Sequence, residues 1–293
     1  MSHYLSLCAI FQNEAPFLEE WLRFHDRIGV EHFFLYDNDS TDEFKPVLAP
    51  WLAAGRVTLY RAAGPAAQIH VYHHCIGAHA RDSFWMIFTD IDEYLFSPAQ
   101  ADLRVFLKGF ESEPGVVANW LMFGSSGHER QPAGLTTLNF ARRCEFDLCT
   151  FEPGLLKDKN LDPKNPASYF KFCGHVKSIV NMRDIVDVGL NVHVFRYRDG
   201  RPSVNANHRP LSGYFSEDES AIGLLRIHHY ASRSWEEYRR RLQRVRADTG
   251  APYEAERLLK RNLLFNQIED KTIFPLAREI ESDMRAQKPP RPG

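Results

Sequence analysis

The chain has 293 residues, of which 44% are hydrophobic and 25% are charged, and its formal net charge is −2. These values are typical of a globular protein with a sizeable core, and the charge gives no reason to expect a nucleic-acid partner. No apolar run reaches the length of a membrane span, and the first predicted strand begins near Tyr4. We therefore expect no transmembrane segment and no signal peptide. The five cysteines form no C-x-x-C pair, which favours a reducing, cytoplasmic compartment.

Short apolar runs bounded by polar residues predict strands. They span residues 5–11, 32–36, 57–60, 86–88 and 116–121. Helices are predicted between these strands over residues 17–28, 68–81 and 103–110. One more helix is expected to start at Ser40, because Ser40 and Glu43 fit a capping box. Alternating strands and helices predict an α/β fold with a mostly parallel sheet covered on both faces.

Two carboxylates, Asp90 and Asp92, directly follow the fourth predicted strand. Side chains alternate in an extended segment, so both should point the same way. At the end of a buried strand they would repel each other unless a cation lay between them. Oxygen ligands of this kind suit Mg²⁺ or Mn²⁺, which keep open positions for substrate phosphates. The spacing alone is explained equally well by two solvated residues at the end of a strand.

Polar side chains also follow the first and second predicted strands. Asn13 and Glu14 follow the first, and Asp37, Asn38 and Asp39 follow the second. The carboxyl ends of parallel strands share one edge of the sheet, where ligands of α/β proteins bind. The chain has no Gly-x-Gly-x-x-Gly or Walker loop, so neither a dinucleotide site nor a P-loop is predicted.

In this order, the motifs resemble glycosyltransferases of the GT-A fold that use nucleotide sugars, within the family 2-like and family 92 group. The matching segments are Cys8–Glu14 with Glu20–Leu22, Tyr36–Asp42, Thr89–Tyr94, Asn119–His128, and His229–Tyr230 with Ser234–Glu237. The usual Asp-Asp after the second strand is Asp37-Asn38 here, which leaves open which side chain binds the base.

The resemblance implies transfer of a sugar from a nucleoside diphosphate, with a uridine nucleotide as the expected donor and inversion at the sugar. It implies a Mn²⁺ or Mg²⁺ ion held by Asp90, Asp92 and His229. It also implies that further side chains face the donor, with Arg233 near a phosphate. These donor-binding candidates are Glu14, Asp37, Asn38, Gln68, Asp90 and Arg233.

Three residues are candidates for the acceptor side. Trp120 could stack on a sugar ring, although a buried core tryptophan is the more common case. His128 and Glu129 follow a glycine-bearing loop, and we nominate Glu129 as the general base that takes the acceptor proton. Residues 152–174 are polar and contain three prolines, and are expected to form a long loop over the site.

The carboxyl-terminal part is expected to be helical. Ser234 and Glu237 fit a capping box that opens a basic helix over residues 238–248. We interpret its arginines as a solvated face, with peripheral contact to an acidic membrane as the alternative. A further helix is expected to start at Pro252. Its packing side would be formed by Leu258, Leu259, Leu263, Leu264 and Ile268. Residues 1–230 are thus predicted to form a GT-A domain, and residues 231–293 a helical extension packed on it.

The predicted function is that of a metal-dependent glycosyltransferase with a nucleotide-sugar donor and a glycan, lipid-linked or protein acceptor. One alternative is a metal-dependent nucleotidyltransferase, although the glycine- and lysine-rich loop usual near the amino terminus of that class is absent. The other alternative is a domain that binds nucleotide sugars or glycans without catalysis.

Overall fold

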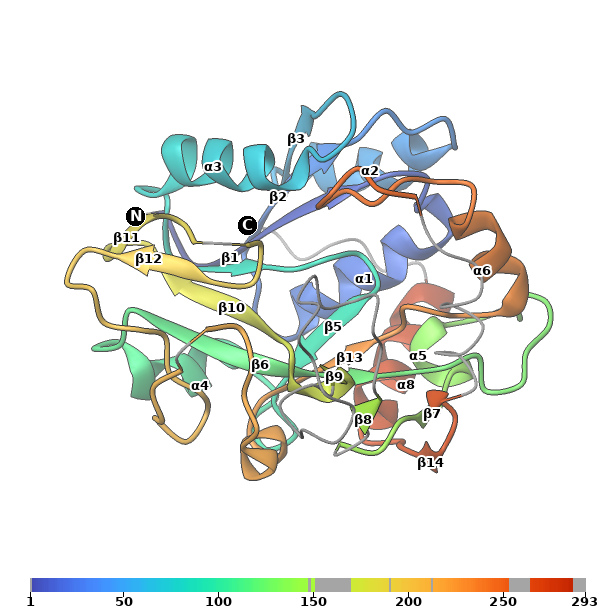
Figure 1. Cartoon of the computed structure of the whole chain (residues 1–293). Coiled ribbons are helices and arrows are strands. Elements are labelled where there is room, and N and C mark those ends of the chain that lie inside the picture. Colours follow the sequence, from blue (N-terminus) through green and yellow to red (C-terminus); the bar gives the residue numbers. More distant parts are fainter. Residues whose placement is uncertain are drawn as a thin grey trace.

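A mixed eight-stranded sheet organises the chain (Figure 1). The computed structural model describes residues 2–146, 149–150, 170–189, 191–211, 213–252 and 264–286. The strand order of the sheet is β3-β2-β1-β4-β10-β6-β13-β5. These strands are β1 His3–Phe11, β2 His32–Asp37, β3 Val57–Arg61, β4 Ser83–Phe88, β5 Glu93–Phe96, β6 Gly115–Met122, β10 Val176–Asn181 and β13 Arg226–His229.

Four consecutive strands of the sheet, β3, β2, β1 and β4, run parallel. β10 is antiparallel to both of its neighbours, β4 and β6, and β13 is parallel to β6 but antiparallel to β5. The predicted α/β class, with a mostly parallel sheet flanked by helices, is confirmed. Strand β5 was not predicted, because its four residues follow Asp92 directly and are too few to show a period.

Helices and short strands cover the sheet. The helices are α1 Ala15–Arg27, α2 Phe44–Ala53, α3 Gln68–His79, α4 Leu103–Leu107, α5 Thr136–Asn139, α6 Trp235–Arg241 and α8 Phe274–Arg285, with 3₁₀ turns at Lys108–Phe110, Phe172–Gly174 and Glu219–Gly223. The short strands are β7 Arg142–Arg143, β8 Cys149–Thr150, β9 Phe170–Lys171, β11 Ile185–Val188, β12 Phe195–Tyr197 and β14 Ile268–Glu269. Within the described ranges, no helix combines the length and the apolar character needed to cross a bilayer.

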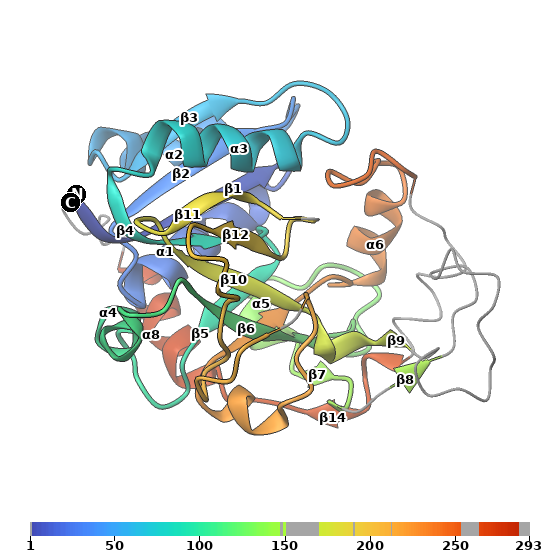
Figure 2. The same ribbon diagram turned by 60° about the vertical axis from the view of Figure 1, so that its left-hand side comes forward.

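The alternation of side chains along β1 divides the core into two layers. Leu5 and Leu7 belong to a layer that also holds the apolar residues of α1, α2 and α4. Cys8 and Ile10 point the other way, into a layer with α3 and the β11–β12 pair. Figures 1 and 2 show α3 and α1 on these opposite faces of the sheet. Both faces of the parallel half are therefore buried, as its continuous apolar strands require.

The predicted helices at 17–28, 68–81 and 103–110 are found as α1, α3 and α4 with its following 3₁₀ turn. The capping box at Ser40 and Glu43 is wrong. The Ser40 hydroxyl instead accepts the backbone N–H of Asn13 at 3.0 Å, and α2 begins at Phe44.

The amino-terminal end of the predicted basic helix is confirmed. The Ser234 hydroxyl accepts the N–H of Glu237 at 3.2 Å, and α6 follows it directly. However, α6 ends at Arg241, seven residues before the predicted end at Asp248. The carboxyl-terminal helix α8 packs against α1 and α5.

Two further predictions lie largely outside the described residues. The predicted loop is described only at its end, where Phe170–Lys171 forms β9 and a 3₁₀ turn follows. Of the helix predicted to start at Pro252, Leu258, Leu259 and Leu263 lie outside the described ranges. Ile268 belongs to strand β14, which pairs with β7, and not to a helix.

Two fully buried histidines predict loss of stability in acid. Burial lowers the pKa of His25 and that of His228 to about 3. In the unfolded chain both would titrate near 6.5, so below that pH the unfolded state binds more protons than the folded state. Stability is therefore full above pH 6.5 and falls as the pH drops, by about 2 kcal/mol for each histidine at pH 5. Urea denaturation at several pH values measures this slope.

The variant His25→Phe keeps an aromatic ring in place but removes one titrating group. We expect its free energy of unfolding to fall less steeply between pH 6.5 and pH 5 than that of the wild type. An unchanged slope would contradict the assignment of His25 as a buried neutral group.

Candidate functional site

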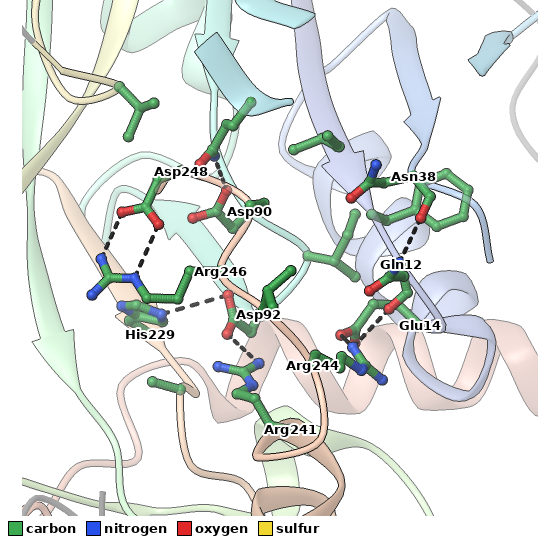
Figure 3. A pocket seen from close by; sticks show the side chains of 18 of the residues that line it. Gln12, Glu14, Asn38, Asp90, Asp92, His229, Arg241, Arg244, Arg246 and Asp248 are labelled. Carbon is green, nitrogen blue, oxygen red and sulfur yellow. Dashed lines mark hydrogen bonds and ion pairs between the residues drawn. The ribbon is translucent and has the colours of Figure 1, made fainter. Parts of the chain in front are cut away.

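A cavity of about 460 Å³ opens at the carboxyl ends of β1, β2 and β4 (Figure 3). Its wall includes residues that follow these strands, among them Gln12, Asn38 and Asp90. Side chains from β6, β10 and β13 and the segment after α6 complete it. Figures 1 and 2 show α6 beyond the carboxyl end of β1. The cavity therefore lies where ligands bind in open α/β sheets.

The loop between β4 and β5 carries Asp90 and Asp92 and is held by hydrogen bonds with Trp21 and Glu93. The Trp21 indole on α1 donates to the carbonyl oxygens of Asp90 (3.1 Å) and Glu93 (3.0 Å). The buried Glu93 carboxylate accepts from the Thr89 hydroxyl (2.6 Å) and from the backbone N–H of Asp90 (3.0 Å). These bonds fix the loop before any ligand binds, so the two aspartates are preorganised.

Among the described residues that line the cavity, four carboxylates face four side chains of Lys or Arg. Each carboxylate forms an ion pair with one of these cations, three of which are drawn in Figure 3. The pairs are Glu14–Arg244 at 3.0 Å, Asp90–Lys177 at 2.9 Å, Asp92–Arg241 at 2.6 Å and Asp248–Arg246 at 2.6 Å. Protein cations thus offset the repulsion that was expected between Asp90 and Asp92.

Two of these pairs contain a buried member, Asp92 or Lys177, whose pKa is set by burial and by the opposite charge beside it. Burial alone would raise the pKa of Asp92, but the nearby Arg241 and His229 outweigh it and hold that pKa well below its usual range. Burial would lower the pKa of Lys177, but Asp90 and Glu93 raise it above its usual value. Asp92 and Lys177 are therefore both charged at neutral pH. Burial raises the pKa of the neighbouring Glu93 to about 7, against the opposing charge of Lys177.

Of the three predicted metal ligands, the structure brings two together. The His229 Nε2 atom, at the end of β13, lies 3.5 Å from Asp92 Oδ1. The Asp90 carboxylate is turned to Lys177 and to the Gln68 amide, which donates to it at 2.6 Å. Among the described residues, no group of three or more His, Cys, Asp or Glu side chains surrounds one metal position. A carboxylate and an imidazole nevertheless fit an ion that takes its remaining ligands from substrate phosphates and water.

The predicted donor-binding residues divide into two groups. Glu14, Asn38, Gln68 and Asp90 line the cavity. Asp37 is not among the lining residues, and its carboxylate accepts the backbone N–H of Ser40 at 2.8 Å.

Arg233, predicted to lie near a phosphate, sits behind the cavity wall. Its side chain is 3% exposed, and it pairs with Glu14 at 2.7 Å. Its guanidinium group also stacks 3.5 Å from the centre of the Phe17 ring. These contacts make Arg233 a support for Glu14.

The acceptor candidates also divide. Trp120 lines the cavity, and its ring stacks on that of His175 with 5.2 Å between the centroids. His128 and Glu129 are not lining residues. Their backbone carbonyls accept the first N–H groups of α6. The His128 ring lies 3.1 Å from the Asn139 carbonyl oxygen, and the Glu129 side chain is 74% exposed. This geometry does not support Glu129 as the general base.

Several cavity residues were not predicted as site residues. Lys177 carries a signal that could have identified it, because it is a lysine inside a strand that also holds Val176, Ile179 and Val180. The arginines after Ser234 were interpreted as a solvated face, which holds for Arg239 and Arg240. Because α6 ends at Arg241, the following chain turns across the cavity and brings Arg244 and Arg246 into its wall.

The Trp21 bonds to the aspartate loop can be tested with a matched pair of variants. Trp21→Phe removes the donor of two backbone carbonyls, and we expect it to cost about 1–3 kcal/mol of stability and to weaken binding of the uridine nucleotide that the resemblance of the sequence implies. Trp51 is equally buried, but its indole donates to Glu19 at 2.9 Å. Trp51→Phe should therefore lower stability without weakening the binding. Calorimetry and denaturant titration measure both quantities, and equal effects of the two variants on binding would contradict the role of Trp21.

Comparison with known proteins identifies the family. Residues 3–261 match the family model described as glycosyltransferase family 92. A glycosyltransferase family 92 protein of Ricinus communis is 26% identical over 83% of this chain and 38% of its own length. The galactan beta-1,4-galactosyltransferase GALS2 of Arabidopsis thaliana is 30% identical over 35% of this chain and 22% of its own length. The chain thus spans less than half the length of these relatives.

Among solved structures, TarS residues 1–349 of S. aureus in complex with UDP match with 14% identity over 47% of this chain and 43% of that chain. The TM-score of 0.31 is too low to carry an argument. The family match covers most of the sequence and includes the four carboxylates and the four paired cations of the cavity wall. The chain belongs to glycosyltransferase family 92.

Proposed function

We propose that the cavity binds a nucleoside diphosphate sugar together with Mn²⁺ or Mg²⁺, and that the sugar is transferred with inversion to a hydroxyl of a glycan, lipid-linked or protein acceptor. Membership of glycosyltransferase family 92 supports the reaction class. The observation that carries the proposal is the balance of charge in the cavity wall, where four carboxylates each have a cationic partner.

A balanced wall has a direct consequence for an anionic ligand. A nucleoside diphosphate sugar brings two negative charges, and burying them without compensation is costly. The lysine and arginines of the described cavity wall are already paired with carboxylates. A divalent cation supplies the missing two charges, and Asp92 with His229 would hold it. When bound, such an ion neutralises the charge that develops on the departing diphosphate.

The order of strands supports an extended donor across the sheet. Asn38 follows β2, Asp90 and Asp92 follow β4, and Trp120 lies on β6. In the sheet these strands occur in the order β2-β1-β4-β10-β6, so the two aspartates lie between Asn38 and Trp120. Because neighbouring strands are about 4.8 Å apart, the row from Asn38 through the two aspartates to Trp120 is about 19 Å long. It suits a base at Asn38, a diphosphate at the aspartates, and the sugar and acceptor at Trp120.

Asn38 supports a uracil base. Its side-chain nitrogen donates both N–H groups, to the carbonyls of Ala62 (2.6 Å) and Gly64 (2.9 Å). This network assigns the amide orientation, so the group left for a ligand is the oxygen, an acceptor. At ring position 3 uracil presents a donor, N3–H, whereas cytosine presents an unprotonated nitrogen that accepts.

The aromatic wall supports a sugar on the acceptor side. The Trp120 ring contacts the rings of His175 (5.2 Å between centroids) and His193 (5.1 Å), which also contact each other (5.8 Å). Burial lowers the pKa of His193 well below its usual value, so its ring is neutral at physiological pH. Neutral flat surfaces of this kind can pack on the apolar face of a sugar ring.

The two alternatives make different predictions. A nucleotidyltransferase would meet the same charge requirement, but it would release pyrophosphate, whereas a glycosyltransferase releases a nucleoside diphosphate. A domain that only binds would release neither. The family match favours the glycosyltransferase.

The metal role predicts a ligand-dependent rise in melting temperature. Uridine diphosphate with Mn²⁺, at 100 times its dissociation constant, should stabilise the fold by about 2.7 kcal/mol and raise the melting temperature by several degrees. A chelator should abolish the rise, and so should Asp92→Asn. Asp37→Asn is the control, because Asp37 lies outside the cavity wall. If no nucleotide stabilises the wild type with Mn²⁺ present, the donor proposal fails.

The base preference is a separate prediction. With Mn²⁺, uridine diphosphate should bind at least about ten times more tightly than cytidine diphosphate, a difference of about 1.4 kcal/mol. In Asn38→Ala this ratio should approach one, because the acceptor is removed. The ratio cancels any general effect on the fold, since both nucleotides share ribose and diphosphate. Calorimetry gives both affinities, and an unchanged ratio in Asn38→Ala would assign base selection to another group.

A further inference from the structure

We propose that Arg241 is an exchangeable counter-ion of Asp92: a divalent cation displaces its guanidinium group from Asp92, and the released group then binds the diphosphate of the donor. This inference rests on the proposed function, because it assumes that ion and diphosphate meet at Asp92. It adds a role for Arg241, which links the binding of the ion to the binding of the diphosphate.

The contacts of Asp92 show which group a bound ion would have to displace. Its side chain is only 9% exposed, and both carboxylate oxygens are engaged. Oδ2 accepts from Arg241 Nη2 at 2.6 Å, and Oδ1 lies 3.5 Å from His229 Nε2 (Figure 3). A divalent ion bound to this carboxylate would face the positive charge of Arg241 at close range, where repulsion in a partly buried site is strong. Ion and guanidinium therefore compete for Asp92.

The position of Arg241 allows it to move. Arg241 is the last residue of α6, and its side chain is 18% exposed at the cavity. Its long unbranched side chain can reorient without any change in the helix.

The other cations of the wall are less suited to this role. Lys177 is 1% exposed near the start of β10 and lies between Asp90 and Glu93. Arg244 donates to the carbonyls of Gln12 (2.7 Å) and Asn13 (2.9 Å) as well as to Glu14. These backbone bonds tie Arg244 to the end of β1, so its release would break three contacts.

Arg246 can also be distinguished from Arg241. It forms two hydrogen bonds with Asp248, at 3.0 Å and 2.6 Å, in a pair two residues apart in sequence. An ion at Asp92 would not displace it, because its partner is a different carboxylate. Among the four pairs of the wall, Asp92–Arg241 is the one whose carboxylate also lies beside a histidine nitrogen.

The balance of charge makes the exchange cooperative. The charges of Arg241 and Asp92 sum to zero. The net charge is again zero when a divalent cation and a diphosphate with two negative charges are both added. Either ligand alone would leave two uncompensated charges in a partly buried site. Ion and diphosphate should therefore bind together more favourably than the sum of their separate affinities, and the coupling is reciprocal.

Arg241→Ala separates this role from a purely structural one. Two ligands are measured. The binding of Mn²⁺ alone is measured by electron paramagnetic resonance of the free ion, and the binding of uridine diphosphate at saturating Mn²⁺ is measured by calorimetry. Without its competitor, Asp92 should bind Mn²⁺ alone about tenfold more tightly, whereas uridine diphosphate should bind about tenfold more weakly. Arg239→Ala is the control, because Arg239 lies on the same helix with its side chain 70% exposed. It should change neither affinity.

Opposite changes of the two affinities in Arg241→Ala, with Arg241→Lys closer to the wild type in both, support the exchange. If Mn²⁺ alone binds Arg241→Ala no more tightly than the wild type, there is no competition and the exchange is overturned. If both affinities fall together, Arg241 is structural and the exchange is again overturned. In these two cases the proposed function stands as long as the wild type binds uridine diphosphate with Mn²⁺. If the wild type does not, the metal role fails and the exchange fails with it.

Discussion

A buried carboxylate needs a positive partner, and the cavity is organised around this requirement. Glu14, Asp90, Asp92 and Asp248 lie in a partly buried wall, where an unpaired charge would cost several kcal/mol. Each is matched by a cation, and the cations come from β10, from the end of α6 and from the chain that follows it. Pairs of this kind contribute little net stability, because desolvation offsets most of the attraction. Their placement together at the carboxyl edge of the sheet, where ligands of α/β proteins bind, is therefore better explained by binding than by folding.

The fold provides one of these partners through β10, which together with β5 runs against the other strands of the sheet. β10 is inserted antiparallel between β4 and β6, and this places Lys177 beside Asp90. On the other side, the Trp21 indole holds the carbonyls of the aspartate loop, so that α1 and β10 fix the loop from two directions. The apolar layers on both faces of the sheet make this frame rigid. The segment after α6 closes the cavity with polar contacts, among them the bonds of Arg244 to the carbonyls of Gln12 and Asn13.

The parts of this design that depend on local sequence could be predicted. The parallel strands, helices α1 and α3 and the aspartates after β4 follow from apolar periodicity and from residues at the ends of runs. The ion pairs could not be predicted, because Asp90 and Lys177 are 87 positions apart and Asp92 and Arg241 are 149 apart. The two capping boxes illustrate the same limit. Ser234 caps its own helix, but the Ser40 hydroxyl is taken by the backbone of Asn13, a distant partner that the local pattern does not reveal.

A neutral wall also affects selectivity. A cavity with surplus arginines would attract any phosphate, including free nucleotides and inorganic phosphate, and the binding would weaken with salt. When every cation of the wall is already paired, an anion gains little binding energy unless it binds together with a cation of its own. Under the proposed function, the wall would favour ligands that carry a diphosphate and a divalent ion together, and the Asn38 oxygen and the Trp120 ring would discriminate among them. The paired charges would then set the general requirement, and the neutral groups at Asn38 and Trp120 would select the ligand.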